Sequence, residues 1–430
     1  MNTKQQLTDG DNESMNKAAT HTKPAPELAQ LDLISQHYIG DPAGTLRQAR
    51  ESEPVFYSEK MTCWVYTRYA DIRAALMDFE TYSNGTLAAA PVPLEYQARV
   101  PTNFFAKSFN AMDPPAHNPV RKVGHSGFSN DRLAPFEAPI TAAANELIDG
   151  FIANGHCELM HDFCHELSHR VITAFMGLPV SDIPRLKQLA EDLPRVFTDH
   201  ITPMPEAEKL LRWHRVADLR DYFRSVIHQR RSVPTTDFVS MLISAKDENG
   251  APLLDDDRIT THMTELVFAG TDTTANLIAR AVILLDRSPA ELARMKQEPE
   301  LTSAAIEEVL RLGGSVNGLF RKTTRQVDIA GHSIPAGAIV YLSTGSADQD
   351  AAQFQQPEAF DITRKEASQH LAFGKGRHLC IGAPLARLET RIALDTLYRR
   401  LPGLKVRPGQ DFEYDPILLS VMLKSLVVEW

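Results

Sequence analysis

The sequence predicts a mainly α-helical fold with a minor β-sheet. Apolar residues recur at helical spacing through most of the chain, most clearly over residues 140–153, 181–193, 207–231 and 303–312. Runs of β-branched and aromatic residues, which are typical of strands, are short and few. With 43% hydrophobic and 23% charged residues, the composition is that of a globular protein with a large core.

The N-terminal segment differs from the rest of the chain. Residues 1–27 are polar, are rich in Asn, Lys, Thr and Asp, and lack the apolar core of a signal peptide. We expect a disordered tail there and a single domain over residues 28–430, because no internal repeat or low-complexity linker interrupts this part. The expected strands lie at residues 55–57, 64–66, 327–329, 338–342 and 425–430.

Charge and cysteine content narrow the function classes. A net charge of −10 argues against nucleic acid as a partner. The sequence has four cysteines, which predicts a reducing, cytoplasmic location without a disulfide framework. No run of 18 or more apolar residues occurs, so the sequence predicts no membrane anchor. We also expect a monomer.

One predicted helix, over residues 255–286, is much longer than the others. About 30 residues at a rise of 1.5 Å would span roughly 45 Å, and Asp255 provides a cap at its start. Its two ends are apolar, but Gly270-Thr271-Asp272-Thr273-Thr274 in its middle are poor helix formers. The alternative interpretation is a polar patch on an exposed helix. The apolar flanks instead predict a buried helix, and poor helix formers in the middle of a buried helix indicate a functional site.

A cysteine stands at the end of a glycine-rich loop, directly before a predicted helix that begins near Ala383. The unpaired N–H groups and the dipole at a helix start favour negative charge, so we expect a lowered pKa for the Cys380 thiol. The thiolate is the form that binds metal ions. Glycines at 374, 376 and 382 let a flat ligand lie close to the backbone.

This loop resembles the haem-binding loop of the cytochrome P450 family, whose pattern is Phe-Gly-x-Gly-x-His-x-Cys-x-Gly. Every fixed position is filled, by Phe373, Gly374, Gly376, His378, Cys380 and Gly382. The resemblance implies a single large fold in which haem b lies between the long helix and this loop, with Cys380 as the axial iron ligand. It also implies a monooxygenase of the bacterial type that lacks a membrane anchor.

The resemblance extends to the long helix. Residues Ala269 and Gly270 match the small residues that let this helix lie over the haem in the family. By the same match, Asp272 is the acid and Thr273 the alcohol that relay protons to iron-bound dioxygen. The Glu308-x-x-Arg311 pair matches a structural pair of the family, although an i, i+3 ion pair by itself carries little information.

Four basic residues match the positions that bind the haem propionates in the family. They are His117, Arg121, Arg321 and His378. Arg forms strong charge-assisted hydrogen bonds with carboxylates. The resemblance also implies a pocket for a mid-sized lipophilic substrate, in which Asn317 would supply a hydrogen bond. The expected pocket residues are Phe104, Phe105, Leu266, Val267, Val316, Asn317, Leu319 and Leu419.

The sequence contains no flavin, nicotinamide or iron–sulfur segment, so electrons must come from a separate ferredoxin-type donor with its reductase. A basic patch for an acidic ferredoxin is expected at Lys375, Arg377, Arg387 and Arg391. The expected activity is insertion of one oxygen atom from O2 by hydroxylation or epoxidation, as in secondary metabolism. The alternatives are a haem-thiolate sensor without turnover, and desaturation or coupling chemistry on the same fold.

A second metal interpretation concerns residues 156–165, which are dense in His, Cys, Asp and Glu. Structural zinc sites pair their cysteines two to four residues apart. Cys157 and Cys164 are too widely spaced for that rule, and buried cysteine commonly behaves as a small hydrophobe. We therefore favour packing over zinc binding for this segment.

Overall fold

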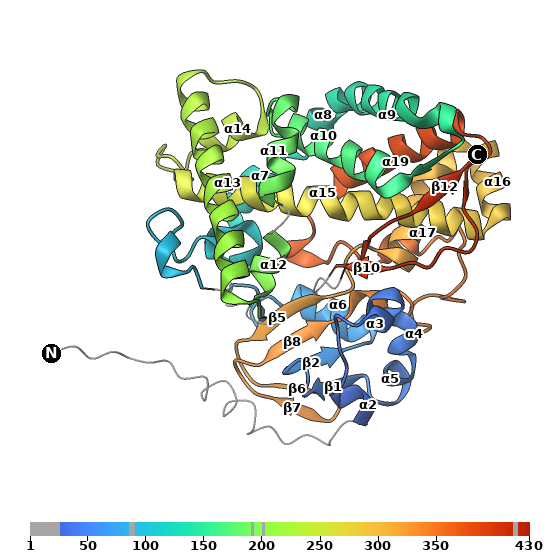
Figure 1. Ribbon diagram of the computed structural model, residues 1–430. Coiled ribbons are helices and arrows are strands. Elements are labelled where there is room, and N and C mark those ends of the chain that lie inside the picture. Colours follow the sequence, from blue (N-terminus) through green and yellow to red (C-terminus); the bar gives the residue numbers. More distant parts are fainter. Residues whose placement is uncertain (1–25, 86–90, 191–192, 200–202, 416–419) are drawn as a thin grey trace.

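The computed structural model describes residues 26–85, 91–190, 193–199, 203–415 and 420–430, so nearly all of the expected tail lies outside the described residues. Figure 1 shows a larger helical part and a smaller part built around a sheet. The prediction of a mainly helical fold with minor sheet is confirmed.

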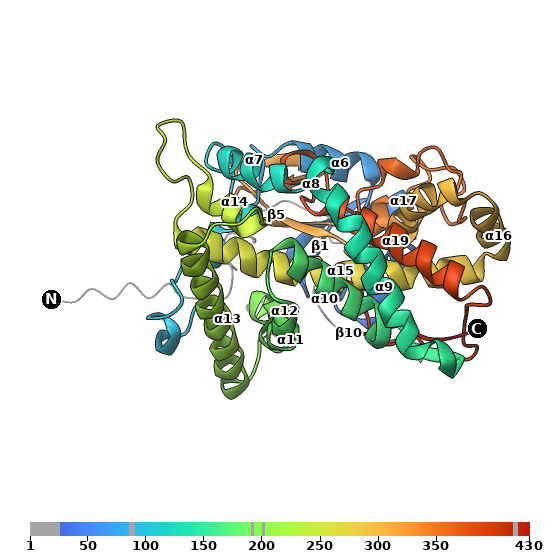
Figure 2. The same ribbon diagram turned by 90° about the horizontal axis from the view of Figure 1, so that it is seen from above.

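Helix α15 (Asp256–Arg287) runs through the middle of the helical part (Figure 2). The Asp255 carboxylate accepts a hydrogen bond from the Arg258 N–H at 2.7 Å and caps the helix. The polar middle remains helical because its threonines bond within the helix; the Thr271 hydroxyl donates to the Val267 carbonyl at 2.9 Å. Packed against α15 are α10 (His165–Phe175), α13 (Glu206–Ser232) and α19 (Ala383–Arg400).

The remaining α-helices of the described residues surround this centre and the sheet. They are α2 (Pro26–Ala29), α3 (Gln36–Gly40), α4 (Pro42–Thr45), α5 (Arg47–Ser52), α6 (Tyr69–Met77), α7 (His117–Gly127), α8 (Asn130–Leu133), α9 (Glu137–Phe151), α11 (Ile183–Ala190), α12 (Leu193–Thr198), α14 (Phe238–Ser244), α16 (Pro289–Gln297), α17 (Thr302–Gly313) and α18 (Thr344–Ala347).

The main sheet joins segments that are far apart in the sequence. Its strand order is β1-β2-β8-β5-β3, with β2 parallel to β8 and the other neighbours antiparallel. Arg321 lies opposite Val340 in this sheet, so a strand positions the arginine. The strands are β1 (Val55–Ser58), β2 (Cys63–Tyr66), β3 (Tyr82–Ser83), β5 (Leu319–Thr323) and β8 (Ile339–Leu342).

Smaller sheets complete the described strands. A three-stranded sheet has the order β4-β12-β9, and β6 with β7 and β10 with β11 form pairs. Their bounds are β4 (His156–Glu158), β6 (Val327–Ile329), β7 (His332–Ile334), β9 (Lys405–Val406), β10 (Tyr414–Asp415), β11 (Met422–Leu423) and β12 (Val427–Glu429).

Helix α10 and strand β5 were not among the expected elements. Helix α10 is amphipathic: Leu167, Val171 and Ile172 are buried, whereas His165 and His169 are partly exposed. The helix is short, and the histidines and cysteines at and before its start obscure this periodicity in the sequence.

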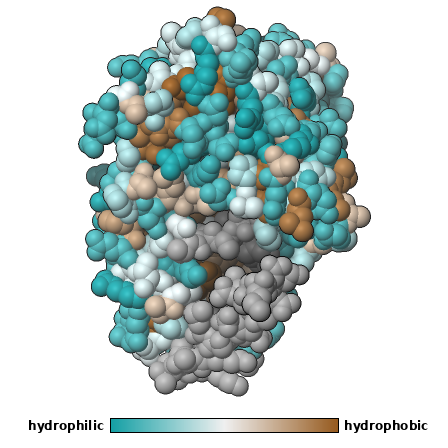
Figure 3. Space-filling model, turned by 90° about the vertical axis from the view of Figure 1, so that its left-hand side faces the viewer, coloured by the Kyte–Doolittle hydropathy of each residue, from teal (hydrophilic) through white to brown (hydrophobic). Residues whose placement is uncertain are grey.

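Figure 3 shows one face of the molecule, and the described residues on it are mainly polar, with local hydrophobic patches among them. Within the described ranges, no helix combines the length and the apolarity that crossing a bilayer requires.

Candidate active site

Cys380 lies at the end of a loop whose backbone requires glycine. The loop runs from Phe373 through the short helix η10 (Gly376–His378), and the Cys380 N–H donates to the Phe373 carbonyl at 2.8 Å. Gly376 has a φ of 71°, and a Cβ there would lie 2.8 Å from the Leu76 carbonyl oxygen. A side chain at this position would therefore force the loop away from α6.

The Cys380 thiol is exposed and stands directly before α19. Backbone hydrogen bonds from Gly382 and Ala383 favour its thiolate, as do the Arg121 and Arg387 guanidinium groups. Desolvation by the surrounding protein outweighs them, so the pKa of Cys380 is raised. The expectation that the helix start lowers this pKa is therefore wrong for the thiol by itself; a coordinated metal ion supplies the charge that deprotonates such a thiol.

Helix α15 exposes one small residue in its buried middle. Ala269 is exposed, whereas Leu266 and Val267 just before it are buried. Gly270 faces α10 instead, where a Cβ would lie 2.9 Å from Ile172 Cδ1. Ala269 can therefore lie against a flat cofactor, whereas Gly270 permits the close packing of α15 on α10.

Asp272 and Thr273 contact different neighbours. Asp272 Oδ1 lies 3.4 Å from His165 Nδ1 at the start of α10. The Thr273 hydroxyl donates to the Ala269 carbonyl at 2.6 Å, and the Thr273 carbonyl accepts from the Ser315 hydroxyl at 2.6 Å. The alcohol thus bonds to the carbonyl of the exposed Ala269, while the acid lies at the contact with α10.

Basic side chains from three elements lie together with few acceptors. The rings of His117 on α7 and His378 on η10 are 4.5 Å apart, and their nitrogens have no hydrogen-bond partner among the described residues. His378 Nε2 lies 3.9 Å from Asp113 Oδ1, which is too far for a hydrogen bond. The buried Arg321 on β5 donates to the Phe320 carbonyl at 2.7 Å. These groups can still donate to an anion.

The pKa values of these basic groups are lowered, as expected for buried bases. Burial lowers the pKa of His378 to about 3, that of Arg321 to about 10, and that of His117 below its ordinary value. Arg121, one turn after His117 on α7, donates to the Leu379 carbonyl beside Cys380. A carboxylate placed among these residues would favour their charged forms and accept their hydrogen bonds.

A family model described as cytochrome P450 matches residues 195–425, which is more than half of the chain. The chain belongs to the cytochrome P450 family. It is 32% identical to pentalenic acid synthase from Streptomyces avermitilis, over 90% of this chain and 92% of that protein. It is 34% identical to the cyclomarin C epoxidase CymV from Salinispora arenicola, over 84% of this chain and 89% of that protein.

A solved structure gives the same assignment for the fold of this cytochrome P450. The crystal structure of P450BioI, in complex with an acyl carrier protein ligated to hexadec-9Z-enoic acid, matches with a TM-score of 0.82 and 27% identity. The match covers 92% of this chain and 100% of that chain. The expected family is therefore confirmed, and the protein is a monooxygenase whose cofactor is haem b.

The residues of this cytochrome P450 fit its cofactor chemically. The exposed Cys380 thiol is a donor for the iron, and the exposed Ala269 leaves room for a flat ring on α15. The unpartnered imidazoles of His117 and His378 match the two carboxylates that haem carries.

Glu308 and Arg311 on α17 form a fully buried, bidentate ion pair. Arg311 Nε and Nη2 donate to the two Glu308 oxygens at 2.8 Å each. Arg311 also donates to the Asp348 and Pro357 carbonyls, and Arg364 Nε donates to Glu308 at 3.0 Å. The pair therefore ties α17 to the segment that precedes the Cys380 loop, and the sequence spacing alone did not reveal its burial.

The expected pocket residues are mostly buried. Phe104, Phe105, Leu266 and Val267 are buried, and the Phe104 carbonyl accepts from the Thr261 hydroxyl of α15 at 3.1 Å. The aromatic loop thus packs on α15. Val316 and Leu319 are half-buried, and Leu419 lies outside the described residues.

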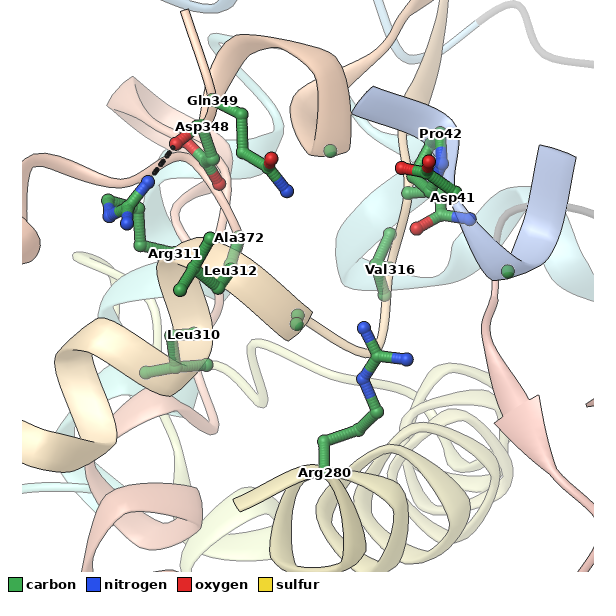
Figure 4. Close-up of a pocket in the computed structure, with 15 residues that line it drawn as sticks. Asp41, Pro42, Arg280, Leu310, Arg311, Leu312, Val316, Asp348, Gln349 and Ala372 are labelled. Atoms are coloured by element: carbon green, nitrogen blue, oxygen red, sulfur yellow. Dashed lines mark hydrogen bonds between the residues drawn. The ribbon is translucent and has the colours of Figure 1, made fainter. Parts of the chain in front are cut away.

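Asn317 is engaged elsewhere in the fold. Its side-chain amide donates to the Ile39 carbonyl at 3.4 Å, and its carbonyl accepts from Gly345. Together with Val316 and Arg280 it lines a polar cavity of about 50 Å³, where Arg280 projects from α15 (Figure 4). Asn317 therefore joins the sheet part to α3 in this structure, which differs from its expected role toward substrate.

Glu265 on α15 is a buried acid that the sequence pattern did not single out. Its buried carboxylate accepts from the Phe109 N–H at 3.2 Å and from the Asn110 side-chain amide. Burial raises the pKa of Glu265 to about 7. An isolated acid in the apolar half of the predicted helix was the available signal.

The His- and Cys-rich segment does not form a metal cluster. Cys157 and Cys164 are buried, and across the part of the chain that the structure describes no three His, Cys, Asp or Glu residues are placed to hold a metal ion. His165 from this segment instead lies against Asp272.

Proposed function

We propose that this cytochrome P450 inserts one oxygen atom of O2 into a mid-sized lipophilic substrate by hydroxylation or epoxidation, in the cytoplasm. The observation that carries the proposal is the arrangement on α15, where the exposed Ala269 is followed by the acid Asp272 and the alcohol Thr273. The similarity to the cyclomarin C epoxidase CymV supports this class of reaction.

We assign the haem contacts as follows. Cys380 would bind the iron through its thiolate, and His117, Arg121, Arg321 and His378 would hold the propionates. Bound haem supplies cleavage of the O–O bond, which a Cys thiolate ligand favours. The residues assigned to line the haem are Ala269, Phe373, Gly374 and Gly382, whereas Gly270, which the sequence also places there, faces α10.

Two further tasks fall to side chains of the chain itself. Asp272 would hold a proton at its carboxyl group and pass it toward the Thr273 hydroxyl. That hydroxyl can give up its hydrogen bond to the Ala269 carbonyl and donate to another acceptor instead. Buried apolar residues, among them Phe105 and Leu266, would orient the substrate and exclude water.

Spectra and isotope labelling test this proposal together. The ferrous–CO spectrum of the wild type should be of the thiolate type, and that of Cys380→Ser should not. With 18O2 and a substrate found by haem spin-state titration, the product should carry one labelled oxygen atom. An imidazole-type CO spectrum would contradict the role of Cys380, and unlabelled product would contradict oxygen insertion.

We further propose an acidic ferredoxin as electron donor. Of the expected basic patch, Arg387 is paired with Glu307 at 2.6 Å and Arg391 with Glu137 at 2.9 Å, which weakens their contribution. A groove of about 340 Å³ beside the Cys380 loop supports docking there. Its lining residues are His117, Asn118, Arg121, Lys122, His125 and Arg377.

Charge reversal tests the docking site. Arg377 donates to the Asn118 side chain at 3.1 Å and lies over the Phe79 ring. Arg377→Glu should slow reduction by a ferredoxin more than it weakens substrate binding, and the difference should shrink at high salt. Lys405→Glu on β9 is the control. Equal reduction rates for the two variants would argue against this surface.

A further inference from the structure

His165 on α10 lies beside Asp272 and has no part in the proposed function. The Asp272 carboxylate lies 3.4 Å from His165 Nδ1, and the two side chains are 35% and 32% exposed. In the described ranges, no other basic side chain lies within 4.0 Å of Asp272. Both side chains are therefore partly open to solvent, and the imidazole is the basic group in contact with the acid.

The other charged groups around His165 have partners or are held neutral. His169, one turn later on α10, donates from Nδ1 to the His165 carbonyl at 2.7 Å, and burial lowers its pKa. Glu166 is paired with Lys187 on α11. On the preceding turn, His161 is 85% exposed and lies 3.6 Å from Asp162. Among these groups, His165 is thus the one that is both partly exposed and in contact with Asp272.

We infer that His165 supplies protons from solvent to Asp272, and so acts as a positioning residue for oxygen reduction. The inference rests on the proposed role of Asp272. In each transfer the His165 Nδ1–H bond breaks and an O–H bond forms on the Asp272 carboxylate. The neutral imidazole then regains a proton from hydronium or a buffer acid in the surrounding water.

The imidazole of His165 is better suited to proton transfer than to simple ion pairing. Imidazole gains and loses a proton near neutral pH, so it can pass on a proton and recover one in each cycle. Lys or Arg in the same place would hold the Asp272 carboxylate but keep its own proton. Proton supply matters here because the second oxygen atom of O2 leaves a monooxygenase as water, which consumes protons.

A set of four variants tests the inference on the full-length holoenzyme. They are His165→Gln, Asp272→Asn, the double variant, and the control His214→Gln, whose Nε2 lies 3.5 Å from Asp218 in a comparable pair on α13. His165→Gln should slow turnover about tenfold, less than the loss of a positioned acid, because water partly replaces the imidazole. It should also raise the solvent deuterium isotope effect and the share of O2 released as hydrogen peroxide.

The double variant separates proton supply from a structural effect. If His165 acts through Asp272, the double variant should turn over no more slowly than Asp272→Asn alone. Independent, multiplicative losses would overturn the inference, as would an unchanged isotope effect in His165→Gln.

A readout that does not depend on activity checks the contact itself. The shifts of the thermal unfolding midpoint in His165→Gln and Asp272→Asn should not add up in the double variant, because both remove the same contact. Additive shifts would contradict the pairing.

The same variants distinguish a wrong role for Asp272 from a wrong role for His165. If Asp272→Asn leaves turnover and isotope effect unchanged, the proposed role of Asp272 is wrong. If Asp272→Asn is impaired but His165→Gln behaves like His214→Gln, the proposed function stands and the inference about His165 is wrong.

Discussion

The imidazole rings of His117 and His378 lie 4.5 Å apart, and neither has a hydrogen-bond partner among the described residues. One comes from helix α7 and the other from the Cys380 loop, so the fold brings together two buried polar groups and leaves both unsatisfied. Burying unpaired polar groups costs free energy, so such groups in a native protein are sites where a ligand or an ordered water can bind. The haem propionates are acceptors that would satisfy them.

We predict that His378→Leu weakens haem retention. Losing a charge-assisted hydrogen bond of about 1.5–3 kcal/mol corresponds to at least a tenfold faster haem loss. The rate of haem transfer to apomyoglobin measures it. His262→Leu is a matched control, since His262 is also buried and unpartnered but stacks on Phe109. Equal transfer rates for the two variants would contradict the assignment.

The Glu308–Arg311 pair should contribute more to the free energy of unfolding than its sequence spacing indicates. Both side chains are fully buried, so Arg311→Leu removes two hydrogen bonds from the Glu308 carboxylate, which keeps Arg364 as its charged partner, and should cost about 3–5 kcal/mol of unfolding free energy. Glu291 and Arg294 have the same spacing on α16 but are partly exposed, at 3.6 Å. Arg294→Leu should cost less than about 1 kcal/mol. Denaturant unfolding compares them, and similar costs would refute the argument from burial.

Gly376 should tolerate alanine less well than another glycine of the same backbone conformation. Gly376 and Gly409 have φ values of 71° and 77°, so alanine strains both by about 1 kcal/mol. Only at Gly376 would the new Cβ meet a backbone oxygen, that of Leu76, at 2.8 Å; Gly409 has open space. We expect Gly376→Ala to lower both the unfolding midpoint and the haem content, and Gly409→Ala to change the midpoint alone. Unchanged haem content in Gly376→Ala would count against the loop argument.

Glu389 on α19 should make stability depend on pH. Burial raises its pKa to about 8 in the folded chain, against 4.5 for an ordinary glutamate. Between these values the folded chain keeps a proton that the unfolded chain has released, so stability falls as pH rises from about 4.5 to about 8.

Glu389→Gln keeps an acceptor for the Ser168 hydroxyl, which lies 2.5 Å from Glu389, and cannot ionise. Its unfolding midpoint should therefore fall less than that of the wild type over this pH range. The exposed Glu358, replaced by Gln, is the control. Parallel curves for all three proteins would show that Glu389 does not titrate as described.

The sequence by itself determined the family, the helical character and the position of Cys380. These features are local: a loop of residues 373–382 carries its pattern in adjacent residues, and the run of poor helix formers that begins at Gly270 is visible in the sequence itself. Local propensity and periodicity act over a few residues, so one sequence suffices to read them.

Only the tertiary structure decided which side chains have partners. His165 lies against Asp272, 107 positions later in the chain, and Arg387 is neutralised by Glu307 from another helix. Helix packing and strand pairing bring such residues together, and no short sequence pattern records them. The protein packed around a side chain then sets its electrostatics, and desolvation by that protein raises the pKa of Cys380 although its place before a helix predicts the opposite.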